Sequence, residues 1–168
     1  MDSNNESSAI DLKPNRDSIK YCQIVDHLLK ESADDFEKGG RFSDKTLVNL
    51  YNVFGEVFER ALELYEQGRV IHISSSTPAA KGTLYNKNNA RWLLQVKGFS
   101  GTIYKLFPEI NFCSCLSFRY QVLRDGAIFT CEHVLAAWLA TVDKEKLSYQ
   151  QITSQQLQDL FLYQTSCK

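Results

Sequence analysis

Four side chains that are good zinc ligands constrain the fold of this chain more than any other feature. They come as two pairs, Cys113-x-Cys115 and Cys131-x-His133, separated by fifteen residues. Three thiolates and an imidazole suit tetrahedral zinc. A Cys-x-Cys pair in a turn aims both sulfurs the same way, and the second pair begins a helical pattern whose N-terminus favours thiolate charge. We therefore predict one zinc ion at the cluster called Cys3His below: Cys113, Cys115, Cys131 and His133.

The residues alone leave three other interpretations of this cluster open. Cys113 and Cys115 could be a redox pair, but this leaves Cys131 and His133 without a role. Cys131 and His133 could be a nucleophile and its base, although residues two apart on a helix point to different faces. The four side chains could also be buried without metal. Four protein ligands leave no open coordination position on zinc, which is typical of a structural site.

The composition is that of one globular domain. The chain has 168 residues, of which 43% are apolar, and a net charge of −1. That apolar content is enough to build a core. The chain has five cysteines, an odd number, and its start lacks the basic and apolar stretches of a secretory signal. Both features argue against a disulfide scaffold. No run of about 18 apolar residues occurs, so we expect no membrane span.

Helical spacing dominates the first part of the chain. We expect residues 1–17, rich in Ser, Asn and charge, to form a disordered tail. In the helical region 18–68, apolar residues with a period of 3.6 predict a first helix that ends at Gly40. A second helix should be capped by Ser43 and continue to Gly68.

Residues 69–142 combine short strands with the Cys3His cluster. Three β-type runs predict a small antiparallel sheet: 70–73, 91–96 and 102–106. After Cys131 the spacing becomes helical again. In residues 143–168 a polar linker precedes a last helix, for which Ser154 is the expected cap. The predicted fold is α+β, with N-terminal helices, a small antiparallel sheet, a zinc finger with its following helix, and a C-terminal helix.

Charge is distributed unevenly along the chain. From Asp26 to Glu66, ten acidic residues stand against five basic ones, whereas from Arg69 to Arg124 eight basic residues stand against one acidic residue. Aromatic residues lie within the same basic stretch, among them Tyr85, Trp92, Phe99 and Tyr104. Positive charge for phosphates and flat faces for bases are what a surface for single-stranded nucleic acid requires. The candidate nucleic-acid contacts are Lys87, Arg91, Lys97, Arg119 and Arg124. The alternative is that the aromatic residues are core and the charges form a solvated face.

The cluster resembles the SWIM-type zinc finger, a family defined by Cys-x-Cys, a variable spacer and Cys-x-His at the start of a helix. Cys113-Ser-Cys115 and Cys131-Glu-His133-Val-Leu-Ala match all four ligand positions. Glu132 stands where many members carry a basic residue, which weakens any phosphate contact at this corner. Looser similarity to the small SWIM-domain subunits of the Shu complex runs from about Thr46 to Phe161.

Resemblance to these subunits implies a non-enzymatic nuclear protein of homologous recombination. Such proteins pair with a RecA-like recombinase paralogue, and the pair supports assembly of recombinase filaments on single-stranded DNA. In that family DNA contact is a property of the complex, and the partner holds the nucleotide-binding fold. This chain has no Gly-x-x-x-x-Gly-Lys-Ser/Thr loop, so we expect no ATPase activity. An apolar surface that includes Trp138 or Phe118 is the expected docking face. The alternative is a free-standing zinc-finger protein that binds nucleic acid, and an enzyme is a third, weaker reading.

Overall fold

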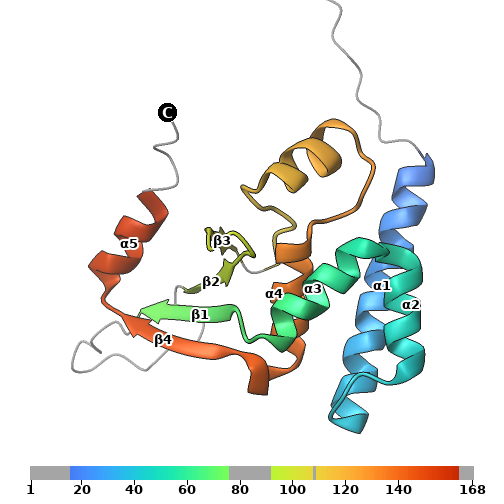
Figure 1. Cartoon of the computed structure of the whole chain (residues 1–168), viewed down its shortest axis with the longest axis horizontal. Coiled ribbons are helices and arrows are strands. Elements are labelled where there is room, and N and C mark those ends of the chain that lie inside the picture. The colour runs from blue at the N-terminus through green and yellow to red at the C-terminus, as the bar shows by residue number, and fades with distance from the viewer. Residues whose placement is uncertain (1–15, 76–91, 108, 163–168) are drawn as a thin grey trace, which may run out of the picture.

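The computed structural model describes residues 16–75, 92–107 and 109–162. It confirms the predicted α+β fold, with helices at both ends of the described chain and a small sheet between them (Figure 1). In chain order the elements are α1 (Arg16–Gly39), α2 (Asp44–Phe54), α3 (Glu56–Glu66), β1 (Val70–Ser75), β2 (Trp92–Lys97), β3 (Ile103–Leu106), the π-helical η2 (Phe118–Arg124), α4 (Glu132–Val142), the 3-10 turn η3 (Lys144–Lys146), β4 (Ser148–Ile152) and α5 (Ser154–Leu162).

The N-terminal helices follow the sequence pattern at their start but not along their whole length. Helix α1 begins at Arg16, two residues inside the expected tail, and residues 1–15 lie outside the described part of the chain. Ser43 caps α2 as predicted, because its Oγ accepts a hydrogen bond of 3.3 Å from the Thr46 amide. The expected single helix up to Gly68 is wrong. Gly55, with φ of 55° and ψ of −134°, separates α2 from α3.

Within the described residues the sheet has four strands, in the order β3-β2-β1-β4. Strand β2 pairs antiparallel with both β1 and β3, as predicted. Strand β4 pairs parallel with β1, from Ile71 opposite Ser148 to Ser75 opposite Ile152, so the sheet is mixed rather than wholly antiparallel. The prediction placed this strand in a linker because its residues are polar and mostly exposed, as an edge strand allows.

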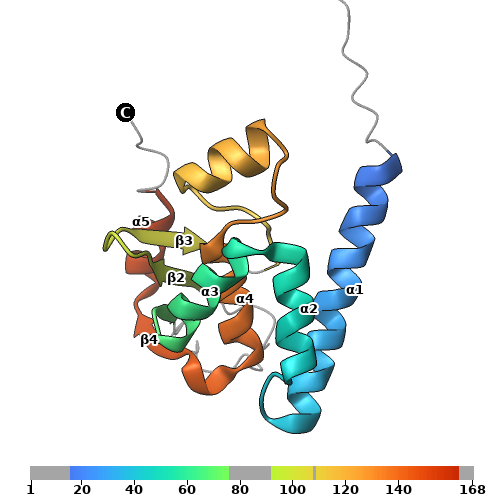
Figure 2. The same cartoon turned by 45° about the vertical axis from the view of Figure 1, so that its right-hand side comes forward.

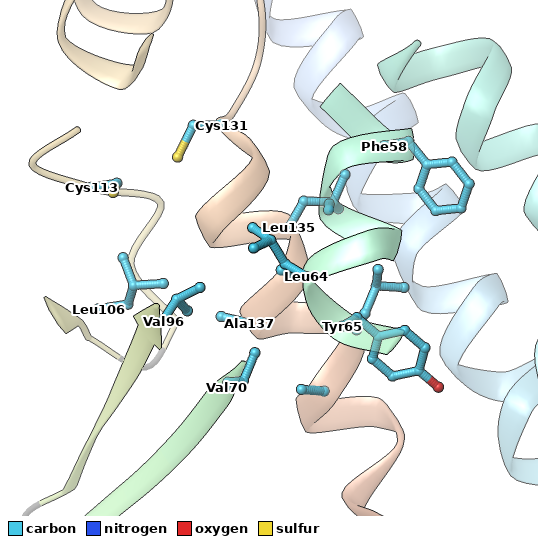
Figure 3. Packing of buried hydrophobic residues seen from close by; sticks show 14 of the residues in the cluster. Phe58, Leu64, Tyr65, Val70, Val96, Leu106, Cys113, Cys131, Leu135 and Ala137 are labelled. Carbon is cyan, nitrogen blue, oxygen red and sulfur yellow. The ribbon is translucent and has the colours of Figure 1, made fainter. Parts of the chain in front are cut away.

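Helices cover both faces of the sheet. Helix α4 packs between α3 and one face of the sheet, and the main core that forms there includes Leu64, Val96 and Leu135 (Figures 2 and 3). Buried residues of α1 and α2 also belong to this core. Helix α5 lies on the other face, where Leu157 joins Ile73 and Leu93 in a smaller core. Helix α5 begins at Ser154, but the capping hydroxyl is that of Thr153, whose Oγ1 accepts from the Gln156 amide at 3.2 Å.

None of the helices in the described part of the chain combines the length and apolar character needed to cross a bilayer.

Candidate metal centre

Two segments carry the four ligands to one place. Cys113 and Cys115 lie in the irregular segment between β3 and η2, and Cys131 is the N-cap residue of α4. The Cys131 carbonyl accepts a hydrogen bond of 3.1 Å from the Leu135 amide, which places His133 in the first turn of α4. Local backbone structure therefore determines each pair, and packing of α4 against the sheet brings the pairs together.

The geometry of the Cys3His cluster fits zinc. One ligand atom from each residue lies within 4.8 Å of all the others, and all four side chains are buried. Sulfurs around tetrahedral zinc are about 3.8 Å apart when each Zn–S bond is about 2.3 Å, so a small contraction reaches this arrangement. The Nδ1 atom of His133 is buried without a hydrogen-bond partner, as expected of an imidazole that binds a metal ion.

Hydrogen bonds among the thiols already concentrate thiolate character in the cluster. Bonds from Cys113 and then Cys131 lower the pKa of Cys115. The bond to Cys115 raises the pKa of Cys113, and bonds with Cys113 and then Cys115 raise that of Cys131. The Phe118 amide also donates to the Cys115 sulfur, at 3.2 Å. Zinc, a positive ion, would extend this stabilisation of thiolate to all three sulfurs.

Gly98 and Tyr104 shape the space around the histidine. The Tyr104 ring lies against the His133 ring with centroids 4.1 Å apart. A Cβ atom at Gly98 would lie 2.9 Å from His133 Nε2 and 3.0 Å from Tyr104 Cε2. Nothing in the sequence indicates that Gly98 lies at the metal site. No local pattern could have revealed this contact, because it depends on how the sheet packs against α4.

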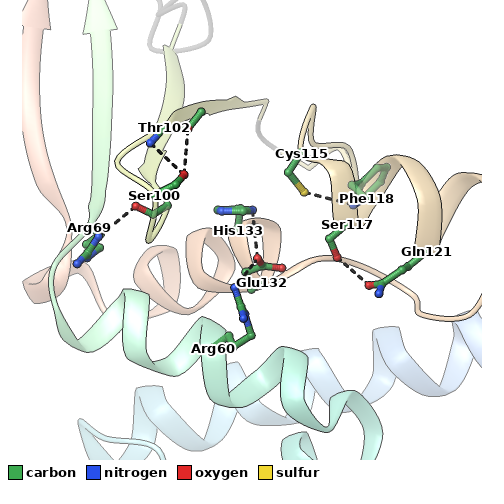
Figure 4. A network of polar contacts seen from close by, with 11 residues as sticks. Arg60, Arg69, Ser100, Thr102, Cys115, Ser117, Phe118, Gln121, Glu132 and His133 are labelled. Carbon is green, nitrogen blue, oxygen red and sulfur yellow. Dashed lines mark hydrogen bonds and ion pairs between the residues drawn. The ribbon is translucent and has the colours of Figure 1, made fainter.

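The acidic residue between the last two ligands also has a structural partner. Glu132 is buried, and its Oε1 accepts a hydrogen bond of 3.5 Å from Nη2 of Arg60 in α3 (Figure 4). The same oxygen lies 4.0 Å from His133 Nδ1. Glu132 thus links α3 to the metal-binding turn, which accounts for an acidic residue at a position where SWIM fingers often carry a basic one.

Zinc in this cluster would act as a structural cross-link. Four buried protein ligands leave no open position for water or substrate. The bound ion would close the chain between Cys115 and Cys131 into a loop and tie that loop to α4. The three buried thiols belong to the main core, so the cross-link continues directly into the hydrophobic packing.

The candidate nucleic-acid residues are only partly described. Lys87 and Arg91, like Tyr85, lie outside the described residues. Lys97 is exposed at the end of β2, whereas Arg119 and Arg124 are exposed together on η2. Arg124 bonds to Asp125, with Nε to Oδ1 at 2.7 Å. The three candidate residues that the structure describes therefore lie on two different elements, β2 and η2. Their contact with nucleic acid stays a prediction.

Of the four aromatic residues named in the basic stretch, Trp92, Phe99 and Tyr104 are described, and all three have partners within the chain. Trp92 stacks on His72 with centroids 4.8 Å apart, and Tyr104 contacts His133. Phe99 lies beneath two guanidinium groups, with the Cζ of Arg60 at 5.2 Å and that of Arg69 at 5.6 Å from its ring centroid. Trp92 and Tyr104 pack against the main core, whereas Phe99 stays 38% exposed.

The two residues expected at a docking face differ in exposure. Phe118 is 1% exposed and belongs to the main core, so the expectation that it contacts a partner is wrong. Trp138 is half-buried and lines an apolar cavity of about 430 Å³ between α1, α4 and the sheet.

Comparison with known proteins identifies relatives over most of the chain. Zinc finger SWIM domain-containing protein 7 of Mus musculus is 30% identical over 148 residues, which cover 88% of this chain and 89% of the mouse protein. The Homo sapiens protein of the same name is 30% identical over 83% of this chain and 90% of its own length. The Danio rerio protein is 30% identical over 77% and 87%.

No family model and no solved structure matches the chain. The relatives are named for the same kind of zinc finger that the Cys3His cluster resembles, and the four ligands meet in the structure as such a finger requires. The chain belongs to the zinc finger SWIM domain-containing protein 7 family, and its cofactor is zinc.

Proposed function

We propose that this protein is a non-catalytic zinc-binding subunit that pairs with a RecA-like recombinase paralogue. The pair promotes assembly of recombinase filaments on single-stranded DNA during homologous recombination repair in the nucleus. Membership of the SWIM-domain protein family over most of the chain carries this proposal, together with the resemblance to the small SWIM-domain subunits of the Shu complex.

The closed metal site supports a role in assembly rather than in catalysis. All four zinc ligands are buried, so the thiols that could perform chemistry are occupied by the metal. The sequence contains no phosphate-binding Gly-x-x-x-x-Gly-Lys-Ser/Thr loop, so ATP binding belongs to the partner.

Co-expression with the RecA-like paralogue of the same organism tests the proposal. We expect the two chains to purify as a 1:1 complex, and the complex to bind an oligo-dT strand more tightly than either chain alone. The His133→Ala variant should lose the complex together with its zinc. A chain that is equally soluble and monomeric with and without the paralogue would contradict the proposal.

Free-standing nucleic-acid binding is the second candidate function, and two exposed cations favour it. Lys97 and Arg119 form no ion pair with any described residue, so both are available to phosphates. This function predicts salt-dependent binding of oligo-dT by the isolated chain, weakened in Lys97→Ala and Arg119→Ala but not in Lys45→Ala, an exposed cation of the acidic helical region. Undetectable binding at low salt would exclude it.

A further inference from the structure

The loop between the two ligand pairs carries apolar side chains that face solvent. Leu116, Tyr120 and Leu123 are 68%, 42% and 63% exposed. Leu116 and Tyr120 lie four residues, about one helical turn, apart in the continuous helical segment 116–124, and Leu123 is exposed further along its π-helical part. Exposed apolar side chains gathered on one short segment mark interaction sites more often than isolated ones do.

The opposite side of the same segment is already used for folding. Phe118 is buried in the main core, and Val122, four residues later, packs against that core. The Phe112 ring contacts the edge of the Phe118 ring at 5.6 Å. The fold therefore accounts for the inward apolar residues, whereas the outward ones contribute nothing to the described core.

The zinc site holds this segment in position. The Phe118 amide donates to the sulfur of Cys115, and the Arg119 amide donates to the Cys115 carbonyl at 3.0 Å. Across the loop, Thr130 Oγ1 donates to Asn111 Oδ1 at 2.8 Å. Figures 1 and 2 both show the segment, drawn in gold, standing apart from the other helices. Its outward side is thus presented on a rigid, metal-anchored support.

Charge indicates what this side can bind. From Ile110 to Thr130 the only acidic residue is Asp125, and it is paired with Arg124, whose guanidinium also lies 4.8 Å from the Tyr120 ring centroid. Arg119 is exposed and makes no ion pair among the described residues. The segment therefore offers aliphatic and aromatic anchors beside one guanidinium that has no carboxylate of its own.

We propose that Leu116, Arg119, Tyr120 and Leu123, called the zinc-loop surface, dock the protein partner of this chain. The inference rests on the proposed function and names the face through which that pairing occurs. The partner would supply an apolar groove bordered by a carboxylate that pairs with Arg119. A protein fits this surface better than nucleic acid does, because leucine side chains neither stack on bases as aromatic rings do nor neutralise phosphates.

Removal of the aliphatic anchors gives the first test. The double variant Leu116→Gln/Leu123→Gln should purify with one zinc per chain but bind the co-expressed RecA-like paralogue at least about tenfold more weakly, since buried anchors dominate interface energies. The matched control is Ile24→Gln/Val48→Gln on α1 and α2, where the side chains are 59% and 56% exposed. The control should bind the paralogue like the wild type.

The arginine gives a second test that separates charge from apolar contact. Arg119→Gln should weaken binding of the paralogue and reduce its dependence on salt. Arg124→Gln should have the smaller effect, because Arg124 is already neutralised by Asp125. Equal losses in the two variants would contradict the assigned role of Arg119.

The outcomes distinguish the docking face from the function. If the wild type binds the paralogue and the leucine variant binds equally well, the zinc-loop surface is not the docking face, and the proposed function stands. If the wild type does not bind the paralogue, the proposed function falls and the inference falls with it. Loss of oligo-dT binding with unchanged binding of the paralogue would assign the surface to nucleic acid and overturn the inference.

Discussion

The absence of a side chain at Gly98 leaves room for the His133 ring. Because a Cβ atom there would lie 2.9 Å from Nε2, Gly98→Ala must displace the imidazole or the neighbouring Tyr104 ring. We expect zinc affinity to fall by about 10- to 100-fold, the usual cost of disturbing the support of a ligand. Competition with a chromophoric chelator measures this. Gly39→Ala, with no atom within 4 Å, is the control, and equal affinities in both variants would contradict the account.

Some residues of the metal centre could be predicted from the sequence, and others could not. The four ligands could be identified because each pair is local and its spacing is specific to zinc. Gly98 and Arg60 could not, since each reaches the centre through tertiary packing. Arg60 lies 72 residues before Glu132, its partner. Phe118 was misassigned to the surface because its exposure depends on how η2 packs against the core.

A buried hydrogen bond joins α3 to the residue that ends α4. The Tyr65 hydroxyl donates to the buried Asp143 carboxylate, and burial followed by this bond raises the pKa of Tyr65. Tyr65→Phe keeps the ring but removes a donor from Asp143, so it should lower the free energy of unfolding by about 1–3 kcal/mol. Urea denaturation measures the change. Tyr51→Phe, at an exposed tyrosine, should alter it by less than about 0.5 kcal/mol.

Among the elements, the break between α2 and α3 depends on one glycine. Gly55 has φ of 55° and ψ of −134°, a conformation open almost only to glycine. Gly55→Ala should lower the free energy of unfolding by about 1–3 kcal/mol or fuse the two helices. Gly40→Ala, at a φ of 66° in open space, should cost only about 1 kcal/mol. Thermal unfolding compares the two, and a Gly55 variant as stable as the wild type would contradict this explanation of the break.

Elements with a strong apolar period were predictable, and those without one were not. Strands β1, β2 and β3 have buried residues that the sequence pattern reveals. Strand β4 is polar and exposed except for Ile152, so only its pairing with β1 defines it as a strand. The stripe before Gly55 continues in register after it, which concealed the break between α2 and α3. The π-helical η2 likewise shows no regular helical period in its sequence.

At the scale of the whole molecule, the zinc site is continuous with the main core. Its three thiols belong to the same cluster as side chains of the helices and the sheet. Figure 3 shows two of them, Cys113 and Cys131, beside residues of α3, α4 and the sheet. Removal of zinc should loosen the loop and α4, which hold the ligands, before α1 and α2, which hold none.

Hydrogen exchange with and without EDTA measures this order. Amides from residue 113 to residue 135 should lose protection most, because zinc closes this segment. Amides near Leu50, packed in α2, should change least. Equal loss of protection in α2 and in the loop would show that zinc supports the whole fold uniformly, contrary to this account.

The central claim, a closed structural zinc site, is tested most directly by zinc content and X-ray absorption on the purified chain. The account predicts one zinc per chain with three sulfurs at about 2.3 Å and one nitrogen at about 2.0 Å. His133→Ala should lower the zinc content and destabilise the fold. A folded wild-type chain that carries no zinc, or zinc with oxygen ligands, would contradict the claim.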